Sequence, residues 1–309
     1  MSITSKEALE VLASRYYQLY LSPAEGKSRS AEYQRIVTEG GIPDGFTAPP
    51  ASFPQGFAAS AGDRLFTVRT PAGDVEAVLV HNRADFERLV QILVHKCEPV
   101  AIPKTMGACT VMGLTNWRKI EAHKAAFLAD GKPEFLWSAE FAAFTADKAN
   151  YQDRLIVVSA GAYSAVPASA LHLEENEWLS ASLRIRLYHE CAHIVCRARF
   201  SGKKHAVWDE LLADCIGLCA AFGGYDRTRA LRLLGIEGER YIGGRLENYL
   251  AAGERIADVL PAVLAWTDFL VQAVQDAARH KSDVLQNEAL FALCLSLETE
   301  FWNEVYHGN

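Results

Sequence analysis

Apolar and polar residues follow two different periods along the chain, and the change of period divides the sequence into two halves. Across residues 64–81 they alternate at every second position around Pro71, Ala72 and Gly73, which predicts a β-hairpin. Residues 153–159 are continuously apolar at their centre and predict a buried strand. The helical period occupies four further stretches of this half: 5–21, 31–38, 84–95 and 117–129.

From residue 177 onward the strand pattern all but disappears. The helical period marks residues 179–200, 207–221, 227–234, 246–252, 255–278 and 284–306. We therefore predict an α+β fold with a mixed sheet in the N-terminal half and an all-helical C-terminal half. We treat residues 1–309 as a single unit with three parts: a helical and Gly/Pro-rich extension (1–62), an α+β half (63–176) and a helical half (177–309).

Composition and charge exclude several classes of protein. Half of the 309 residues are hydrophobic and 22% are charged, which is typical of a globular chain with a large core. The 31 basic and 38 acidic residues give a net charge of −7, which argues against sequence-independent nucleic-acid binding. Residues 256–278 are apolar but interrupted by acidic residues, so we expect an amphipathic helix there and no membrane span.

The N-terminus and the cysteines indicate the compartment. The first seven residues lack the basic run and apolar block of a secretory signal. Four of the seven cysteines, Cys191, Cys196, Cys215 and Cys219, lie in apolar helical segments, where reduced buried thiols are the common case and a second, thiolate metal site is the rarer alternative. We expect a cytoplasmic protein with no nucleic-acid or membrane partner. The sequence does not specify an oligomeric state.

One motif carries chemistry: His189-Glu190-Cys191-Ala192-His193, in a stretch without Pro or Gly. Positions i and i+4 of a helix share one face, so the two imidazoles can hold one Zn²⁺ ion. Glu190 lies beside that face, where it can take a proton from a metal-bound water as general base. Two helical histidines with no metal are the competing interpretation.

The third ligand must come from further along the chain. The extended metzincin pattern needs glycine and histidine where this chain has Cys196 and Arg199, so that class is excluded. His205 is a possible ligand in a segment that reads as a loop. On the next predicted helix, Glu210 and Asp214 share one face, so Glu210 can complete a His₂Glu set and Asp214 can accept the ring N–H of a ligand histidine.

The segments HECAH and DELLADCIG together resemble the gluzincin, or thermolysin-like, zinc metallopeptidases. The resemblance covers residues 180–220 and implies a zincin-like fold, one Zn²⁺ per chain held by His189, His193 and Glu210, Glu190 as general base, and Asp214 behind a ligand. The interval between His193 and Glu210 is shorter than in thermolysin, which leaves Asp209 as a competing third ligand. By this resemblance we expect a zinc metallopeptidase that cleaves peptide bonds. The alternative is a catalytically silent zinc-binding regulatory or interaction protein.

Three further roles stay open at this stage. Tyr225, Tyr241, His205 and Arg245 are candidates for stabilising the oxyanion of the reaction. Residues 155–159 are either the edge strand along which a substrate lies or an interior strand. Residues 103–117 either line a cleft with Asn116 and Trp117 or form a hairpin before a helix whose Trp packs in the core.

Overall fold

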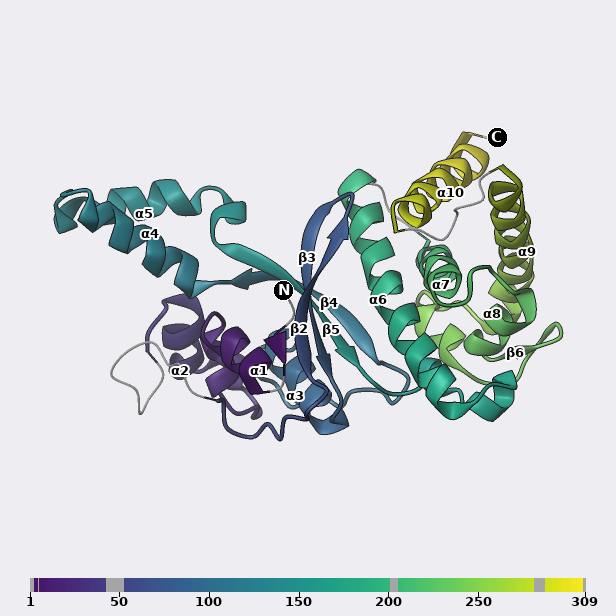
Figure 1. Cartoon of the computed structure of the whole chain (residues 1–309), viewed down its shortest axis with the longest axis horizontal. Helices are drawn as coiled ribbons and strands as arrows, with labels where there is room; N and C mark the ends of the chain where they lie inside the picture. The colour runs from purple at the N-terminus through teal and green to yellow at the C-terminus, as the bar shows by residue number, and fades with distance from the viewer. Residues whose placement is uncertain (1–2, 5, 43–52, 201–204, 281–286, 308–309) are drawn as a thin grey trace. The chain divides into compact units, whose positions relative to one another are not determined.

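The computed structural model describes residues 3–4, 6–42, 53–200, 205–280 and 287–307, and its chain forms two compact units (Figure 1). Unit 1 comprises Met1–Thr67, Val75–Ile102 and Cys109–Ser159, and unit 2 comprises Val68–Asp74, Pro103–Ala108 and Ala160–Asn309. The chain is α+β, as the hydrophobic pattern predicts. Parts of three predicted segments, residues 43–52, 201–204 and 284–286, lie outside the described residues.

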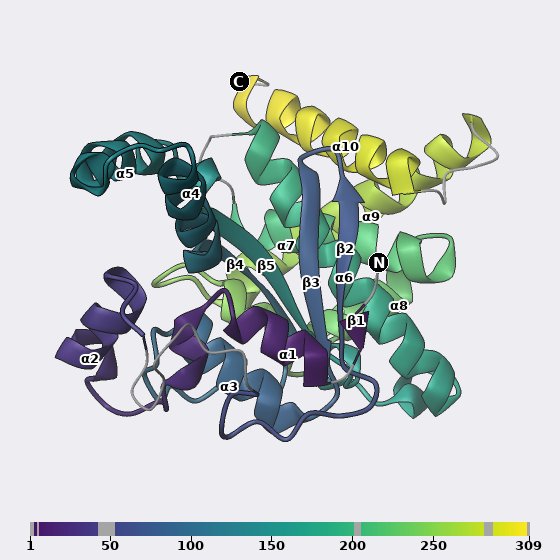
Figure 2. The ribbon, with the colours of Figure 1, turned by 60° about the vertical axis from the view of Figure 1, so that its left-hand side comes forward.

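A mixed five-stranded sheet contributes most of its residues to unit 1 (Figure 2). Its strands are β1 (Ile3–Thr4), β2 (Arg64–Thr70), β3 (Gly73–Val80), β4 (Ala108–Thr115) and β5 (Gln152–Ser159), in the order β1-β2-β3-β5-β4. β1 is antiparallel to β2, while β3 is parallel to β5 with Glu76 opposite Leu155. β5 is therefore an interior strand, and its central residues are fully buried, which explains their apolar run.

Short helices complete unit 1. They are α1 (Lys6–Ala13), η1 (Tyr17–Tyr20), η2 (Lys27–Arg29), α2 (Ala31–Tyr33), η3 (Gln34–Thr38), α3 (Arg83–Leu93), α4 (Trp117–Ala129), η4 (Glu134–Leu136), α5 (Trp137–Thr145) and η5 (Lys148–Asn150). α4 begins and ends where the pattern predicts, whereas α5 was not predicted. Trp117 is buried and donates its indole N–H to the Val37 carbonyl, so it packs in the core of this unit. Asn116 bonds to Asp153.

Unit 2 is built on the pair α6 (Glu175–Arg199) and α7 (Ala206–Phe222), which make the most extensive contact between any two described elements. Around them lie η6 (Tyr163–Ala165), η7 (Ala168–Leu171), α8 (Arg227–Leu234), β6 (Ile236–Glu237), β7 (Arg240–Tyr241), η8 (Arg245–Tyr249), α9 (Ile256–His280) and α10 (Asn287–His307). The expectation of an all-helical half is corrected by the β6–β7 ribbon. The predicted helix 246–252 is the 3-10 helix η8.

Helix α9 is the one described helix long and apolar enough, by length and composition, to cross a membrane. Its buried residues recur every three to four positions: Val259, Val263, Thr267, Leu270 and Val274. Such a stripe is the pattern of a helix that packs along one side. α9 contacts α7, α8 and α10 within unit 2.

Candidate metal centre

The HExxH segment forms the C-terminal part of α6, an uninterrupted helix of 25 residues. His189 and His193 are one turn apart and are both buried. Their Nε2 atoms lie 3.0 Å apart, so both rings point into the same small space. The sequence predicts this shared face from the i, i+4 spacing alone.

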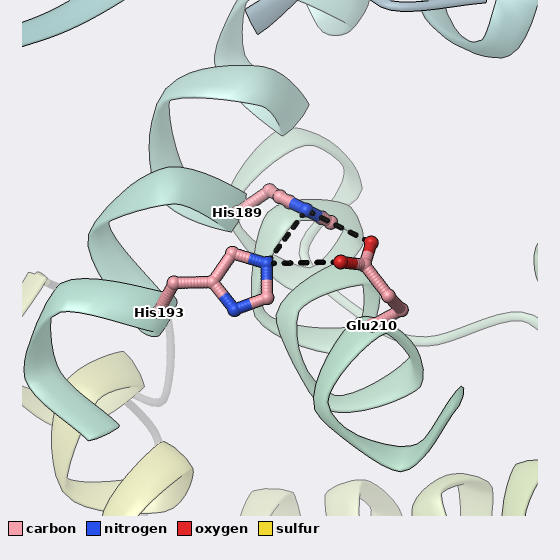
Figure 3. Close-up of side chains that lie close together, drawn as sticks. All are labelled: His189, His193 and Glu210. Carbon is pink, nitrogen blue, oxygen red and sulfur yellow. Dashed lines mark hydrogen bonds and ion pairs between the residues drawn. The ribbon is translucent and has the colours of Figure 1, made fainter. Parts of the chain in front are cut away.

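Glu210 projects from α7 toward the two imidazoles (Figure 3). One carboxylate oxygen lies 3.4 Å from His189 Nε2 and the other lies 3.5 Å from His193 Nε2. Bonds of about 2.0–2.1 Å at tetrahedral angles place two zinc ligands about 3.3 Å apart. One donor atom from each of the three residues lies within 4.8 Å of the other two, so the group converges closely enough to hold a metal ion.

Gly217 on α7 allows the close approach of the two helices that the site needs. A Cβ atom added to Gly217 would lie 2.7 Å from the Ile185 carbonyl oxygen of α6. Backbone atoms at that distance leave no room for any larger residue. The glycine three positions after Asp214 is therefore required by packing between α6 and α7.

The outer nitrogen of His189 is held by a buried network. Its Nδ1 lies 2.9 Å from an Asp214 oxygen, which also accepts a 2.6 Å hydrogen bond from the Tyr163 hydroxyl. Arg245 donates one N–H to that hydroxyl at 2.9 Å and another to the second Asp214 oxygen. Asp214 thus accepts from Tyr163 and Arg245, and it can also accept from a protonated Nδ1 of His189, the arrangement that leaves Nε2 of that ring for a metal.

The outer nitrogen of His193 has its own carboxylate. Asp209 Oδ2 lies 3.0 Å from His193 Nδ1, on the side of the ring away from Glu210. Asp209 is thus placed behind a ligand, and Glu210 faces the shared space. Of the two residues that compete as third ligand in the sequence, Glu210 lies between the two rings and Asp209 lies outside His193.

Burial and neighbouring charges shift the pKa values of these groups. Burial lowers the pKa of His189, and this outweighs the opposing effect of Glu210. Burial also opposes a charge on His193, but hydrogen bonds to Asp209 and Glu210 outweigh it and raise its pKa to about 10. Burial would raise the pKa of Glu210, yet its bonds to both histidines hold it well below the usual value. One proton on His193 therefore lies between the donors that a cation would bridge.

Two further groups lie near the site. Glu190 is buried on α6, and its charge acts on the pKa values of both His189 and Tyr249. Burial and the adjacent Glu210 carboxylate raise the pKa of Tyr249 to about 12, although Arg245 opposes this. A protonated phenol therefore lies beside the third candidate ligand, a position suited to donating a hydrogen bond.

Comparison with known proteins adds a family. The family model described as Family of unknown function (DUF7005) matches residues 2–299. The chain belongs to the DUF7005 family. No curated protein and no solved structure matches it.

The four oxyanion candidates occupy different places in this DUF7005 chain. Arg245 is brought to the site, where it bonds to Asp214 and Tyr163. The Tyr241 hydroxyl bonds to the backbone of Gly244 within its own turn. Tyr225 is buried beside Cys215, Cys219 and Thr267, and the His205 ring packs edge-on against Trp266.

Sequence reasoning missed Tyr163 and Tyr249 in this DUF7005 chain. Tyr163 precedes Ser164 and Ala165, which both have left-handed backbones at φ 55° and 57°. Such strain in residues other than glycine is concentrated at functional sites, but it leaves no signal in the sequence. Tyr249 ends η8, and its ring centre lies 5.8 Å from the Arg245 guanidinium, a contact that no local pattern predicts.

The cysteines of the DUF7005 chain stay outside the candidate centre. All seven are free thiols, and those on α6 and α7 are buried. Cys196 lies 3.4 Å from Cys294 of α10, and burial raises the pKa of Cys215 well above its usual value. Among the described residues, the one group of three donors that converges as a metal site is His189, His193 and Glu210. The alternative of a thiolate site gains no support.

Proposed function

We propose that this DUF7005 protein is a zinc-dependent hydrolase of gluzincin type, with peptide bonds as its substrate. The observation that carries the proposal is the convergence of His189, His193 and Glu210, whose donor atoms lie within 4.8 Å of one another. Catalytic zinc sites keep three protein ligands and one open position, whereas structural sites have four. The α+β fold, with its HExxH helix followed by α7, is in this proposal a zincin-like fold.

The residues around these three donors fit the remaining roles. A bound Zn²⁺ ion supplies a Lewis acid and lowers the pKa of water to about 7. His189, His193 and Glu210 hold the ion, while Asp214 and Asp209 fix the orientation of the two rings. Glu190 accepts the proton of the attacking water on its carboxylate and returns it to the leaving nitrogen. Tyr249 donates a hydrogen bond to the oxygen of the scissile carbonyl.

A second candidate is a catalytically silent zinc-binding protein with a regulatory or interaction role. The observation that favours it is the limited exposure of the ligands, whose side chains are 9%, 7% and 20% accessible for His189, His193 and Glu210. A site this enclosed also suits an ion with a purely structural role. The two candidates share the metal and differ in turnover.

Hydrolysis by a matched set of variants separates the two. Zinc-loaded wild type, Glu190→Gln and the control Glu177→Gln, an exposed carboxylate on the same helix, are incubated with a synthetic peptide library. We expect wild type and the control to produce fragments detectable by mass spectrometry. We expect Glu190→Gln to keep its zinc and to be roughly 10²–10⁴ times slower. Stoichiometric zinc with no cleavage by wild type would favour the silent protein.

A further inference from the structure

A cavity of about 580 Å³ lies within unit 1, in the part of the chain that does not contribute to the metal centre. It is bordered by η3, by Thr115 and Trp117 where β4 leads into α4, and by α5. Val37, Trp117, Ile120 and Phe141 form an apolar wall. The volume falls within the range of small-molecule sites, roughly 300–1,000 Å³.

Among the described residues that line the cavity, one carries a positive charge and none carries a negative charge. Lys96 is the one charged residue among those lining it, and the other polar groups are neutral hydroxyls and an amide, among them Tyr33, Gln34 and Tyr151. Within the described residues, no hydrogen bond or ion pair is made by the Lys96 side chain. The ammonium group is thus available to an anion, and an apolar surface lies beside it.

The backbone at this lysine is strained. Lys96 and Cys97 both have left-handed conformations, with φ of 53° and 63°. Both follow α3, where a chain that leaves a helix in this conformation usually has glycine. A β-carbon in the left-handed region is unfavourable, so the fold alone would favour glycine at position 96. Strain of this kind in residues other than glycine is concentrated at ligand sites.

A second irregular segment borders the same cavity. Residues Gln34–Thr38 form the π-helical turn η3, and Gln34, Val37 and Thr38 line the cavity. Single π-helical turns are rare and occur frequently at functional sites. The two unusual backbone segments are about 60 residues apart in sequence and meet at this one cavity.

An adjoining cavity of about 280 Å³ extends the site along the sheet. It shares Tyr33, Val37, Lys96 and Thr115 with the first cavity and continues along β4. Lys96 therefore lies between two lobes, one with aromatic walls and one beside the edge strand of the sheet. A ligand with an acid group at Lys96 can place its apolar body in the aromatic lobe.

We propose that unit 1 binds a small organic carboxylate with an apolar body, whose acid group pairs with Lys96 and whose body packs against Trp117, Ile120 and Phe141. The charge of Lys96 selects the acid, and the wall selects a molecule of low polarity. This site goes beyond the proposed hydrolase. It requires none of the residues of the metal centre.

The test uses the full chain without added zinc and two probes, phenylacetate and octanoate, with their uncharged amides as controls. Binding is measured by isothermal titration calorimetry for wild type, Lys96→Gly, Lys96→Arg and Lys104→Gln, an exposed lysine outside the cavity. We expect wild type to bind a carboxylate at least ~10-fold more tightly than its amide, because a charged hydrogen bond is lost in the amide. Lys96→Arg and Lys104→Gln should keep this preference.

Lys96→Gly distinguishes a binding role from a structural one. It removes the charge and relieves the left-handed strain, so we expect it to lose at least ~10-fold in carboxylate affinity and to gain ~2 °C in Tm. A wild type that binds neither acid at millimolar concentration would overturn the proposal. Equal affinity of Lys96→Gly and wild type would also overturn it, as would a fall in Tm, since Lys96 would then serve the fold. None of these outcomes depends on zinc or hydrolysis.

Discussion

Each histidine of the candidate centre has one nitrogen facing the shared space and the other facing an acidic residue of α7. Asp214 lies 2.9 Å from Nδ1 of His189, and Asp209 forms an ion pair with Nδ1 of His193 at 3.0 Å. A carboxylate behind an imidazole fixes the tautomer and makes the opposite nitrogen a better donor to a metal. Asp209 and Asp214 would thus orient both rings toward the same ion in the proposed metal site.

Binding of zinc should release a proton from His193. At pH 8 the pH lies above the ordinary histidine value of 6.5 and below the raised pKa of about 10, so metal-free His193 keeps its proton. A cation at Nε2 must displace it. Calorimetric titration with zinc in buffers of different ionisation enthalpy should therefore show release of about one proton per ion. Binding with no proton release would contradict this assignment.

Tyr249 should act on the rate of the reaction rather than on substrate binding. Removing its hydroxyl in Tyr249→Phe deletes the proposed donor to the scissile carbonyl, so kcat should fall about 10²-fold with little change in KM. Tyr241→Phe is the matched control, since that hydroxyl bonds to its own turn. If both variants retain the wild-type kcat, Tyr249 is not the hydrogen-bond donor to the scissile carbonyl.

At the scale of elements, the site depends on how closely α7 lies against α6. Gly217 packs against the backbone carbonyl of Ile185 on α6. The same helix, α7, carries the three acidic residues Asp209, Glu210 and Asp214. The positions of three functional carboxylates are therefore set by one helix packing. A small change in that packing should alter stability and metal affinity together.

The variant Gly217→Ala tests this coupling. Its Cβ would force α7 away from Ile185, so we expect a loss of about 1–3 kcal/mol in unfolding free energy and weaker zinc binding. Gly224→Ala, where an added Cβ meets no atom within 4 Å, is the control. Chemical denaturation and zinc titration of both variants measure the two effects. If Gly217→Ala is less stable but binds zinc with wild-type affinity, the packing of α7 on α6 does not control the metal site.

The same elements show how far sequence reasoning reaches. The helices that carry His189, Glu190, His193, Glu210 and Asp214 follow from local period and spacing, and the structure contains them. The contacts of Tyr163 with His189, Asp214 and Arg245 join residues 26, 51 and 82 positions apart. No local pattern encodes such pairings, because they depend on how η6, α7 and η8 pack. For the same reason β5 could not be assigned to the interior of the sheet before its neighbours were known.

At the scale of the molecule, the two compact units should respond differently to zinc. The three candidate ligands, and Asp209 and Asp214 beside them, belong to unit 2. An ion that binds only the folded state stabilises it by about 2.7 kcal/mol at a hundredfold excess over Kd. Hydrogen exchange should therefore slow in α6 and α7 when zinc is added, with smaller changes in α3 and β5. A uniform response, or none, would argue against a centre confined to unit 2.

The central claim is that one zinc ion is bound by two histidines and Glu210, without thiolates. X-ray absorption at the zinc edge of the loaded protein tests it most directly, since zinc–nitrogen and zinc–oxygen bonds are about 2.0–2.1 Å and zinc–sulfur bonds about 2.3 Å. We predict one ion per chain with two imidazoles, light-atom ligands at the short distance, and loss of the ion in His193→Ala. A sulfur shell, or zinc retained unchanged by His193→Ala, would contradict the account.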